Sequence, residues 1–212
     1  GRSGSFFKYE GLGCIYWHMA SKLLLAAQEM VAPAGDPEAA AVLPRLRAHC
    51  HALHEGLSPH KSPAVHGAFP IDPYSHTPAH LGAQQPGLTG QVKEDIIARR
   101  RELGAIVEGG ALRFQPLLLR RRELLAAPRD FEYLDLRGSW QRLALPAGSL
   151  AFTICQVPVI YHLAEQPRLV VSRGAGPALP LDGASLGPEL SRALFDRTDE
   201  IRRIEVFLPI SA

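Results

Sequence analysis

The chain has 212 residues, of which 46% are hydrophobic and 21% are charged, and its formal net charge at pH 7 is +2. This is the composition of an ordinary globular protein, and the length suffices for a sizeable core in one large or two small domains. The near-neutral charge excludes the strongly basic nucleic-acid-binding proteins. The two arginine runs, 99–101 and 120–122, are therefore interpreted as solvated helix and loop faces.

The cysteines and the N-terminus indicate a cytoplasmic protein without a membrane anchor. Cys14, Cys50 and Cys155 are too widely spaced and too few for a disulfide framework, which favours reduced thiols. The first residues lack the apolar core of a signal peptide, and no apolar run approaches the length of a membrane span. The chain starts without Met and soon enters an apolar helix, so we expect a piece of a longer protein rather than a processed complete one.

Residues 1–104 are predicted to be helical. Apolar spacing predicts a buried helix over 12–31, and Asp36 with Pro37 is a good start for a second helix that reaches about His54. A third helix is predicted from Thr89 to Leu103 and ends at Gly104. The side chains expected to face the core are Ile15, Met19, Leu23 and Ala26 in the first helix, and Val92, Ile96, Ile97 and Leu103 in the third.

A long connection over residues 55–90 separates the second and third helices. Its most informative part, with the helix start that follows, runs from Gly67 to Glu94 and is dense in Pro, Gly, His, Tyr, Thr and Gln. Loops this long are uncommon in compact domains unless they are functional or disordered, and this one is too rich in rings and too poor in charge for a disordered tail. A polar loop that ends at a helix N-terminus favours an anionic or hydroxyl-rich ligand.

Residues 105–212 are predicted to form a β-domain. Short segments of strand type alternate with turn residues, which is typical of an antiparallel β-sandwich, and a short helix is expected over 187–196. The expected strands are 105–107, 110–115, 131–136, 141–145, 149–157, 159–163, 168–172 and 201–208. The chain is thus predicted to be an α+β protein of two parts, 1–104 and 105–212.

No metal site is predicted. His49, Cys50, His51 and His54 lie close together, but they lack the spacing of a zinc site, and exposed helix histidines are the preferred interpretation. In the loop, His76 and His80 are interpreted either as hydrogen-bond donors to a sugar or phosphate or as partners of loop carbonyls.

Nothing in the chain predicts a complete catalytic centre. Cys155 is expected inside an apolar strand, where a thiol is inert. The carboxylates considered for glycosidase chemistry are Glu10, Asp72 and Glu94, of which Glu94 is placed to compensate a helix dipole. Thr89 and Gly90 offer a hydroxyl and backbone N–H groups to a ligand, although an ordinary N-cap explains them as well.

Several short motifs appear in a familiar order. Leu-Thr-Gly at 88–90 opens a helix, Leu-Gly follows at 103–104, and the segment 106–116 reads Ile-Val-x-Gly-Gly-x-Leu-x-Phe-x-Pro. Leu-Asp-Gly at 181–183 and Ile-Glu-Val at 204–206 complete the pattern. This order resembles the C-terminal portion of carbohydrate-active enzymes built on an (α/α)₆ toroid, in particular the cellobiose and chitobiose phosphorylases, and also the end of large bacterial proteins of no assigned reaction.

The resemblance implies a partner and a set of binding residues. The N-terminal helices would be the last helices of a toroid, the upstream toroid domain would carry the general acid, and no cofactor would be needed. The ligands would be an oligosaccharide and, for a phosphorylase, inorganic phosphate. The residues implied in binding, or placed by the loop around the motif, are Tyr74, His76, His80, Gln84, Gln85, Thr89 and Gly90.

Three functions are consistent with these observations. The first is the C-terminal part of a glycoside phosphorylase or hydrolase that completes a sugar or phosphate site without catalysing alone. The second is a non-catalytic module that binds a glycan or another subunit. The third is a structural fragment whose loop packs over partners, which an exposed apolar face on the first helix would favour.

Overall fold

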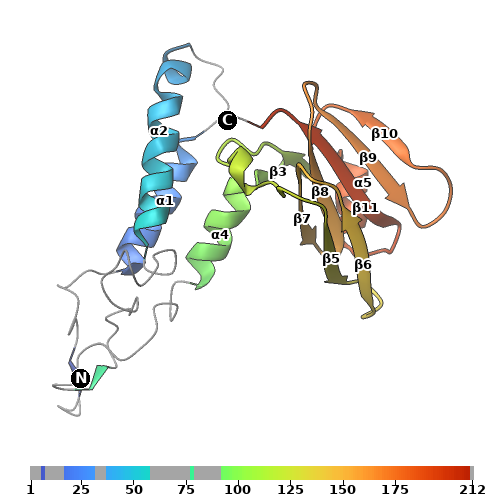
Figure 1. The fold of residues 1–212 in the computed structure, drawn as a ribbon, viewed down its shortest axis with the longest axis horizontal. Coiled ribbons are helices and arrows are strands. Elements are labelled where there is room, and N and C mark those ends of the chain that lie inside the picture. The colour runs from blue at the N-terminus through green and yellow to red at the C-terminus, as the bar shows by residue number, and fades with distance from the viewer. Residues whose placement is uncertain (1–5, 8–16, 32–36, 58–76, 79–91, 211–212) are drawn as a thin grey trace. The chain divides into compact units, whose positions relative to one another are not determined.

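The computed structural model describes residues 6–7, 17–31, 37–57, 77–78 and 92–210 (Figure 1). The chain divides into two compact units, Gly1–Arg101 and Glu102–Ala212. Helices come first and mostly antiparallel strands follow, which confirms the predicted α+β class.

The first unit contains a pair of packed helices, α1 (Trp17–Glu29) and α2 (Pro37–Gly56). It also holds α4 (Val92–Glu102) except for its last residue, and the short antiparallel pair of β1 (Phe6–Phe7) and β2 (Thr77–Pro78). Arg101 near the end of α4 joins α1: its Nη2 lies 2.7 Å from Glu29 Oε1, and its Nη1 donates to Leu25 O. Of the helices described, none is long and apolar enough to cross a lipid bilayer.

The predicted apolar stripes of these helices are partly wrong. In α1 the buried side chains are Ser21, Leu24 and Gln28, whereas Leu23 is 56% exposed, so the buried face is turned from the expected one. In α4 Ile96 and Ile97 are exposed, because the buried face passes through the small side chain of Ala98 instead. Leu103, which follows α4, is buried as predicted.

The second unit is built on a five-stranded sheet whose spatial order is β10-β9-β11-β8-β7. Its strands are β7 (Ser149–Ile154), β8 (Val157–Leu163), β9 (Arg168–Arg173), β10 (Leu179–Asp182) and β11 (Ile201–Leu208). Neighbours run antiparallel except β11 and β8, which pair in parallel with Ile204 opposite Val159. The sheet is therefore mixed, and not the purely antiparallel arrangement that alternation of residues predicts.

One face of the sheet carries the core of this unit. Val159, Tyr161, Leu169, Ile204 and Val206 are each fully buried on it. In β8 the intervening residue Ile160 is buried too, so this strand is covered on both faces. Helix α5 (Pro188–Phe195) and β4 (Ala111–Phe114) contribute to the same core, and α5 contacts both β4 and β11. The Tyr161 hydroxyl donates to Leu103 O from inside this core.

Two hairpins accompany the sheet. The first is β3 (Ala105–Glu108) with β4, and the second is β5 (Arg129–Leu134) with β6 (Trp140–Leu145). A 3₁₀ turn at Arg121–Glu123 lies between them. Gly104 enters β3 with φ +68°, and a Cβ on it would lie 2.1 Å from the backbone carbon of Gln115, so only glycine fits there.

The main differences from the predicted strands concern β10 and the end of β7. No strand was predicted over 179–182, but β10 pairs with β9 along the sheet edge. The strand expected over 149–157 stops at Ile154, because Cys155 and Gln156 form a two-residue turn into β8. Cys155 therefore lies in a turn and not inside a strand, and it is half-buried.

Candidate functional site

A cavity of about 280 Å³ lies in the second unit where three loops meet. These are the turn between β5 and β6, the turn between β7 and β8, and the segment that leads from α5 into β11. Its lining is mostly polar and consists of Tyr133, Asp135, Leu136, Arg137, Gln141, Gln156, Val157, Asp199, Ile201 and Arg202. We call it the hairpin cavity. Concave sites with a few placed polar groups are the usual places where proteins bind small molecules.

Asp135 organises the turn between β5 and β6. Its Oδ1 accepts hydrogen bonds from the backbone N–H groups of Arg137 and Ser139, each at 2.9 Å, and its Oδ2 accepts one from Gln141 Nε2, also at 2.9 Å. A short aspartate side chain that bonds to N–H groups two and four residues later fixes such a turn. The hydrogen bond from the Ser139 N–H is the main reason why the pKa of Asp135 is lowered, so this side chain is an ionised acceptor at neutral pH.

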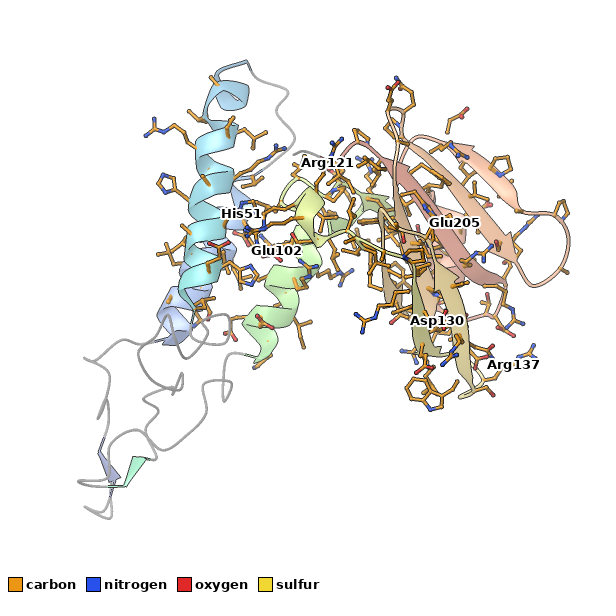
Figure 2. The ribbon with its side chains drawn as sticks, viewed as in Figure 1. His51, Glu102, Arg121, Asp130, Arg137 and Glu205 are labelled. Atoms are coloured by element: carbon orange, nitrogen blue, oxygen red, sulfur yellow. The ribbon has the colours of Figure 1, made fainter. Side chains whose placement is uncertain are left out.

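Asp199, which also lines the cavity, joins two arginines. Arg202 holds both carboxylate oxygens of Asp199, with Nη1–Oδ1 at 2.5 Å and Nη2–Oδ2 at 2.6 Å. Arg137, at the turn between β5 and β6 (Figure 2), reaches the same Oδ2 with its Nη2 at 3.1 Å. This second contact ties the hairpin to the segment before β11. Because Arg137 is 67% exposed, it contributes at most about 1 kcal/mol.

The turn between β7 and β8 has an unusual backbone. Ile154 pairs with Val157, so Cys155 and Gln156 alone make the connection, with φ angles of +50° and +65°. Two-residue turns of this kind favour Asn-Gly, because both central residues need positive φ. The Gln156 side chain crosses to the neighbouring turn, where its Nε2 donates to Asp135 O at 3.0 Å.

Left-handed backbone is concentrated around this cavity. In the part of the chain that the structure describes, four residues other than glycine have positive φ: Cys155, Gln156, Arg197 and Asp199. Gln156 and Asp199 line the cavity, and the other two lie within two residues of them in sequence. Such conformations cost of order 1 kcal/mol each and persist where the surrounding structure fixes them, often at ligand sites. Their clustering makes this cavity the candidate functional site of the second unit.

Tyr133 brings a phenol to the cavity from β5. Its ring stacks on that of Phe131 with centroids 5.7 Å apart. Burial is the main cause that raises the pKa of Tyr133, and the charge of Asp135 adds to it, against smaller opposite effects of Arg203 and Arg202. The phenol therefore keeps its proton at neutral pH and both donates and accepts hydrogen bonds.

The binding residues predicted from the sequence are not tested by this geometry. Tyr74, His76, His80, Gln84, Gln85, Thr89 and Gly90 all lie outside the described residues. In α2, Cys50 is buried and His49 is exposed as expected, whereas His51 and His54 are half-buried. Among the side chains that the structure describes, no three His, Cys, Asp or Glu residues converge as metal ligands.

The residues of the hairpin cavity were not singled out in the sequence. The strongest available signal was the segment 135–139, in which an aspartate precedes Arg-Gly-Ser after a strand, a pattern that predicts a turn closed by the aspartate side chain. Asp199 and Gln156 gave no such signal, because their contacts with Arg137 and Asp135 join residues that are 62 and 21 positions apart in sequence. In comparisons with known proteins, no family model matches the chain, and no curated protein is significantly similar to it.

Proposed function

We propose that this chain provides carbohydrate binding, without catalysis of its own, as the C-terminal part of a glycoside phosphorylase or hydrolase. The observation that carries the binding proposal is the hairpin cavity, where hydrogen-bonding side chains and left-handed backbone converge. The enzyme class rests on the resemblance of the sequence motifs at 88–90 and 103–116.

The chemistry of the cavity lining supports a hydroxyl-rich ligand. Sugar hydroxyls both donate and accept hydrogen bonds, and the cavity presents amides from Gln141 and Gln156, a phenol from Tyr133 and the ionised Asp135. The two glutamines and Asp135 are anchored by their own hydrogen bonds, and the Tyr133 ring stacks on Phe131, so a ligand meets an ordered surface and loses little affinity to reordering.

The carboxyl groups of the cavity are unsuited to glycoside cleavage. That reaction needs a carboxylic acid whose pKa is raised so that it donates a proton to the leaving group, with a second carboxylate beside the sugar. Here the pKa of Asp135 is lowered, and Asp199 is paired with two arginines. Binding without catalysis is therefore the activity that fits the described residues of this cavity.

A separate subsite belongs to the loop before α4, and it rests on the sequence alone. By resemblance, Thr89 and Gly90 with His76 or His80 would hold the phosphate or a sugar of the enzyme's main site. In the enzyme with its upstream toroid domain, Thr89→Val and His80→Ala are expected to weaken turnover. Unchanged kinetics in both variants would contradict this part of the proposal.

A subunit-interaction module is the second candidate. Trp140 at the start of β6 is 76% exposed, and its cross-strand partner Leu134 is 39% exposed, so the β5–β6 hairpin carries an apolar pair open to solvent. Exposed apolar side chains that lie next to one another, as cross-strand partners do, are a feature of contact surfaces. If this candidate holds, Trp140→Ser weakens the contact between subunits, so sedimentation velocity should show a species of lower molecular mass than the parent assembly. Sugar binding should be unchanged.

The direct test is calorimetric titration of the 212-residue chain with glucose, cellobiose and chitobiose. We expect binding of at least one sugar, a marked loss in Gln156→Gly, and no change in the matched control Gln166→Gly, which alters an exposed glutamine outside the cavity. With cellobiose and inorganic phosphate the chain should release no glucose 1-phosphate. Absence of binding to all three sugars refutes the binding proposal, and turnover refutes the absence of catalysis.

A further inference from the structure

The two outer strands of the five-stranded sheet, β10 and β7, differ in how their edges are protected. β10 carries Pro180, which has no N–H to offer a further strand, and the charged Asp182. β7 reads Ser-Leu-Ala-Phe-Thr-Ile and has neither a charge nor a proline. Among the strands that the structure describes, none pairs with the outer side of β7. Proteins usually protect an exposed edge with charges or proline, so the unprotected edge of β7 is suited to pair with another strand.

The pairing with β8 determines which backbone groups of β7 face outward. Ile154 and Val157 flank a two-residue turn, so they exchange backbone hydrogen bonds with each other. Alternation along the strand then turns the N–H and C=O groups of Ala151 and Thr153 away from β8. Thr153 is exposed and Ala151 is half-buried, so the outward groups of both residues lie at the surface.

There is room beside part of this edge. A cavity of about 330 Å³ lies between β5 and β7, and Ala151 lines it (Figure 1). At the start of the strand the edge is already used, because Ser149 O accepts a hydrogen bond from Leu125 N at 2.8 Å. That bond comes from outside the sheet, in agreement with the alternation. An added strand must therefore pair with residues 150–154 and end before Ser149.

A second copy of β7 meets these conditions when it runs antiparallel with Phe152 opposite Phe152 of the other chain. Ala151 of each chain then faces Thr153 of the other, and these pairs exchange four backbone hydrogen bonds across the twofold axis. On the other face of the strand, Leu150 lies opposite Ile154, so apolar side chains meet apolar ones. No charge of the strand opposes this pairing, because it has none.

We propose that two copies of this chain associate through the outer edges of β7, which joins their two sheets into one continuous sheet across a twofold axis. The inference is independent of the proposed carbohydrate binding and of the exposed Trp140 on the β5–β6 hairpin. Because the overlapping segments are short, we expect a weak dimer whose population rises with protein concentration.

Sedimentation velocity of the 212-residue chain over a range of concentrations tests the inference. We expect a reversible equilibrium between monomer and dimer. Thr153→Pro removes an outward N–H without touching the bonds to β8, and the twofold axis doubles the loss to two hydrogen bonds. Dimerisation should weaken about thirtyfold. The matched control Thr153→Val keeps the N–H and should dimerise like the parent.

Disulfide trapping tests the register. Residues that face each other in a hydrogen-bonded antiparallel pair have Cα atoms about 5.5 Å apart, which a disulfide spans. Mild oxidation of a mixture of Ala151→Cys and Thr153→Cys chains should therefore give a dimer linked through positions 151 and 153, identified by peptide mass spectrometry. Ala151→Cys alone should give no link at position 151, because its two copies lie diagonally, roughly 7–8 Å apart.

Each outcome supports or overturns the inference. A chain that stays monomeric at every concentration overturns it. So does a dimer that persists in Thr153→Pro when the circular dichroism of the variant matches the parent. A dimer that Trp140→Ser dissociates and Thr153→Pro does not places the contact on the hairpin and also overturns it. If Thr153→Pro fails to fold, the trapping decides: the link between positions 151 and 153 supports the inference, and its absence overturns it.

Discussion

Gln156 allows the backbone strain of the cavity to be measured separately from the hydrogen bond of its side chain. Gln156→Ala and Gln156→Gly both remove the Nε2 bond to Asp135 O, which is worth about 1 kcal/mol. At φ +65° alanine keeps the cost of left-handed backbone, roughly 1–2 kcal/mol, whereas glycine is relieved of it. We therefore expect the alanine variant to lose about 1 kcal/mol and the glycine variant to remain within about 1 kcal/mol of the parent.

The sign of the difference between these two variants is the decisive quantity. At ordinary positions glycine is less stable than alanine by about 0.5–1 kcal/mol, so a glycine variant that is more stable reverses the usual order. In urea denaturation followed by circular dichroism, a difference of about 1 kcal/mol separates the midpoints by about 0.5 M. Gln166, which is exposed and has no positive φ, is the matched control and should show the usual order. If Gln156→Ala is as stable as Gln156→Gly, the strain argument is refuted.

Three further predictions concern the second unit. Gly104→Ala should destabilise it by several kcal/mol in thermal denaturation, because the new Cβ meets the Gln115 backbone at 2.1 Å; a loss below about 1 kcal/mol would contradict the close approach. Tyr161→Phe should cost about 1–3 kcal/mol in urea, since Leu103 O then loses its buried donor, and a neutral result would mean that another group replaces it. Asp135→Asn should be less stable than the parent near neutral pH. The pKa of Asp135 in the folded protein lies below its ordinary value of 3.8, so the ionised side chain stabilises the fold above that pH, and the stabilisation is lost as the pH falls through the folded-state pKa. The difference in unfolding free energy between the parent and Asp135→Asn should therefore shrink on acidification. A difference independent of pH would contradict the assignment.

The sequence predicts this fold where local rules decide it. Alternation located most strands of the second unit, and Gly104 marked the end of α4 correctly. β10 was not predicted. It contains Pro180, and proline argues against a strand, although edge strands tolerate it. The parallel pairing of β8 with β11 was not predicted either, since the alternation of residues within one strand does not specify which strand lies beside it.

The candidate site could not be predicted to the same extent. The turn at Cys155 and Gln156 contains neither glycine nor asparagine, so the residues that usually announce a two-residue turn are missing. Tertiary contacts hold it instead, among them the bond from Gln156 to the carbonyl of Asp135. Asp199 and Arg137 are 62 residues apart in the chain, and such a pairing leaves no local trace in the sequence.

The position of β11 in the sheet has a consequence for the synthesis and folding of this unit. It is the last of the five strands in the chain and lies between β8 and β9, and its parallel and antiparallel ladders are what join the two strand pairs to each other. During synthesis the β7–β8 and β9–β10 pairs emerge first, each with an inner edge of unpaired N–H and C=O groups. Until β11 arrives, those edges are open to other chains, and unpaired strand edges of this kind favour aggregation. A truncation that removes β11 should leave the β7–β8 and β9–β10 hairpins without the ladders that join them into one sheet.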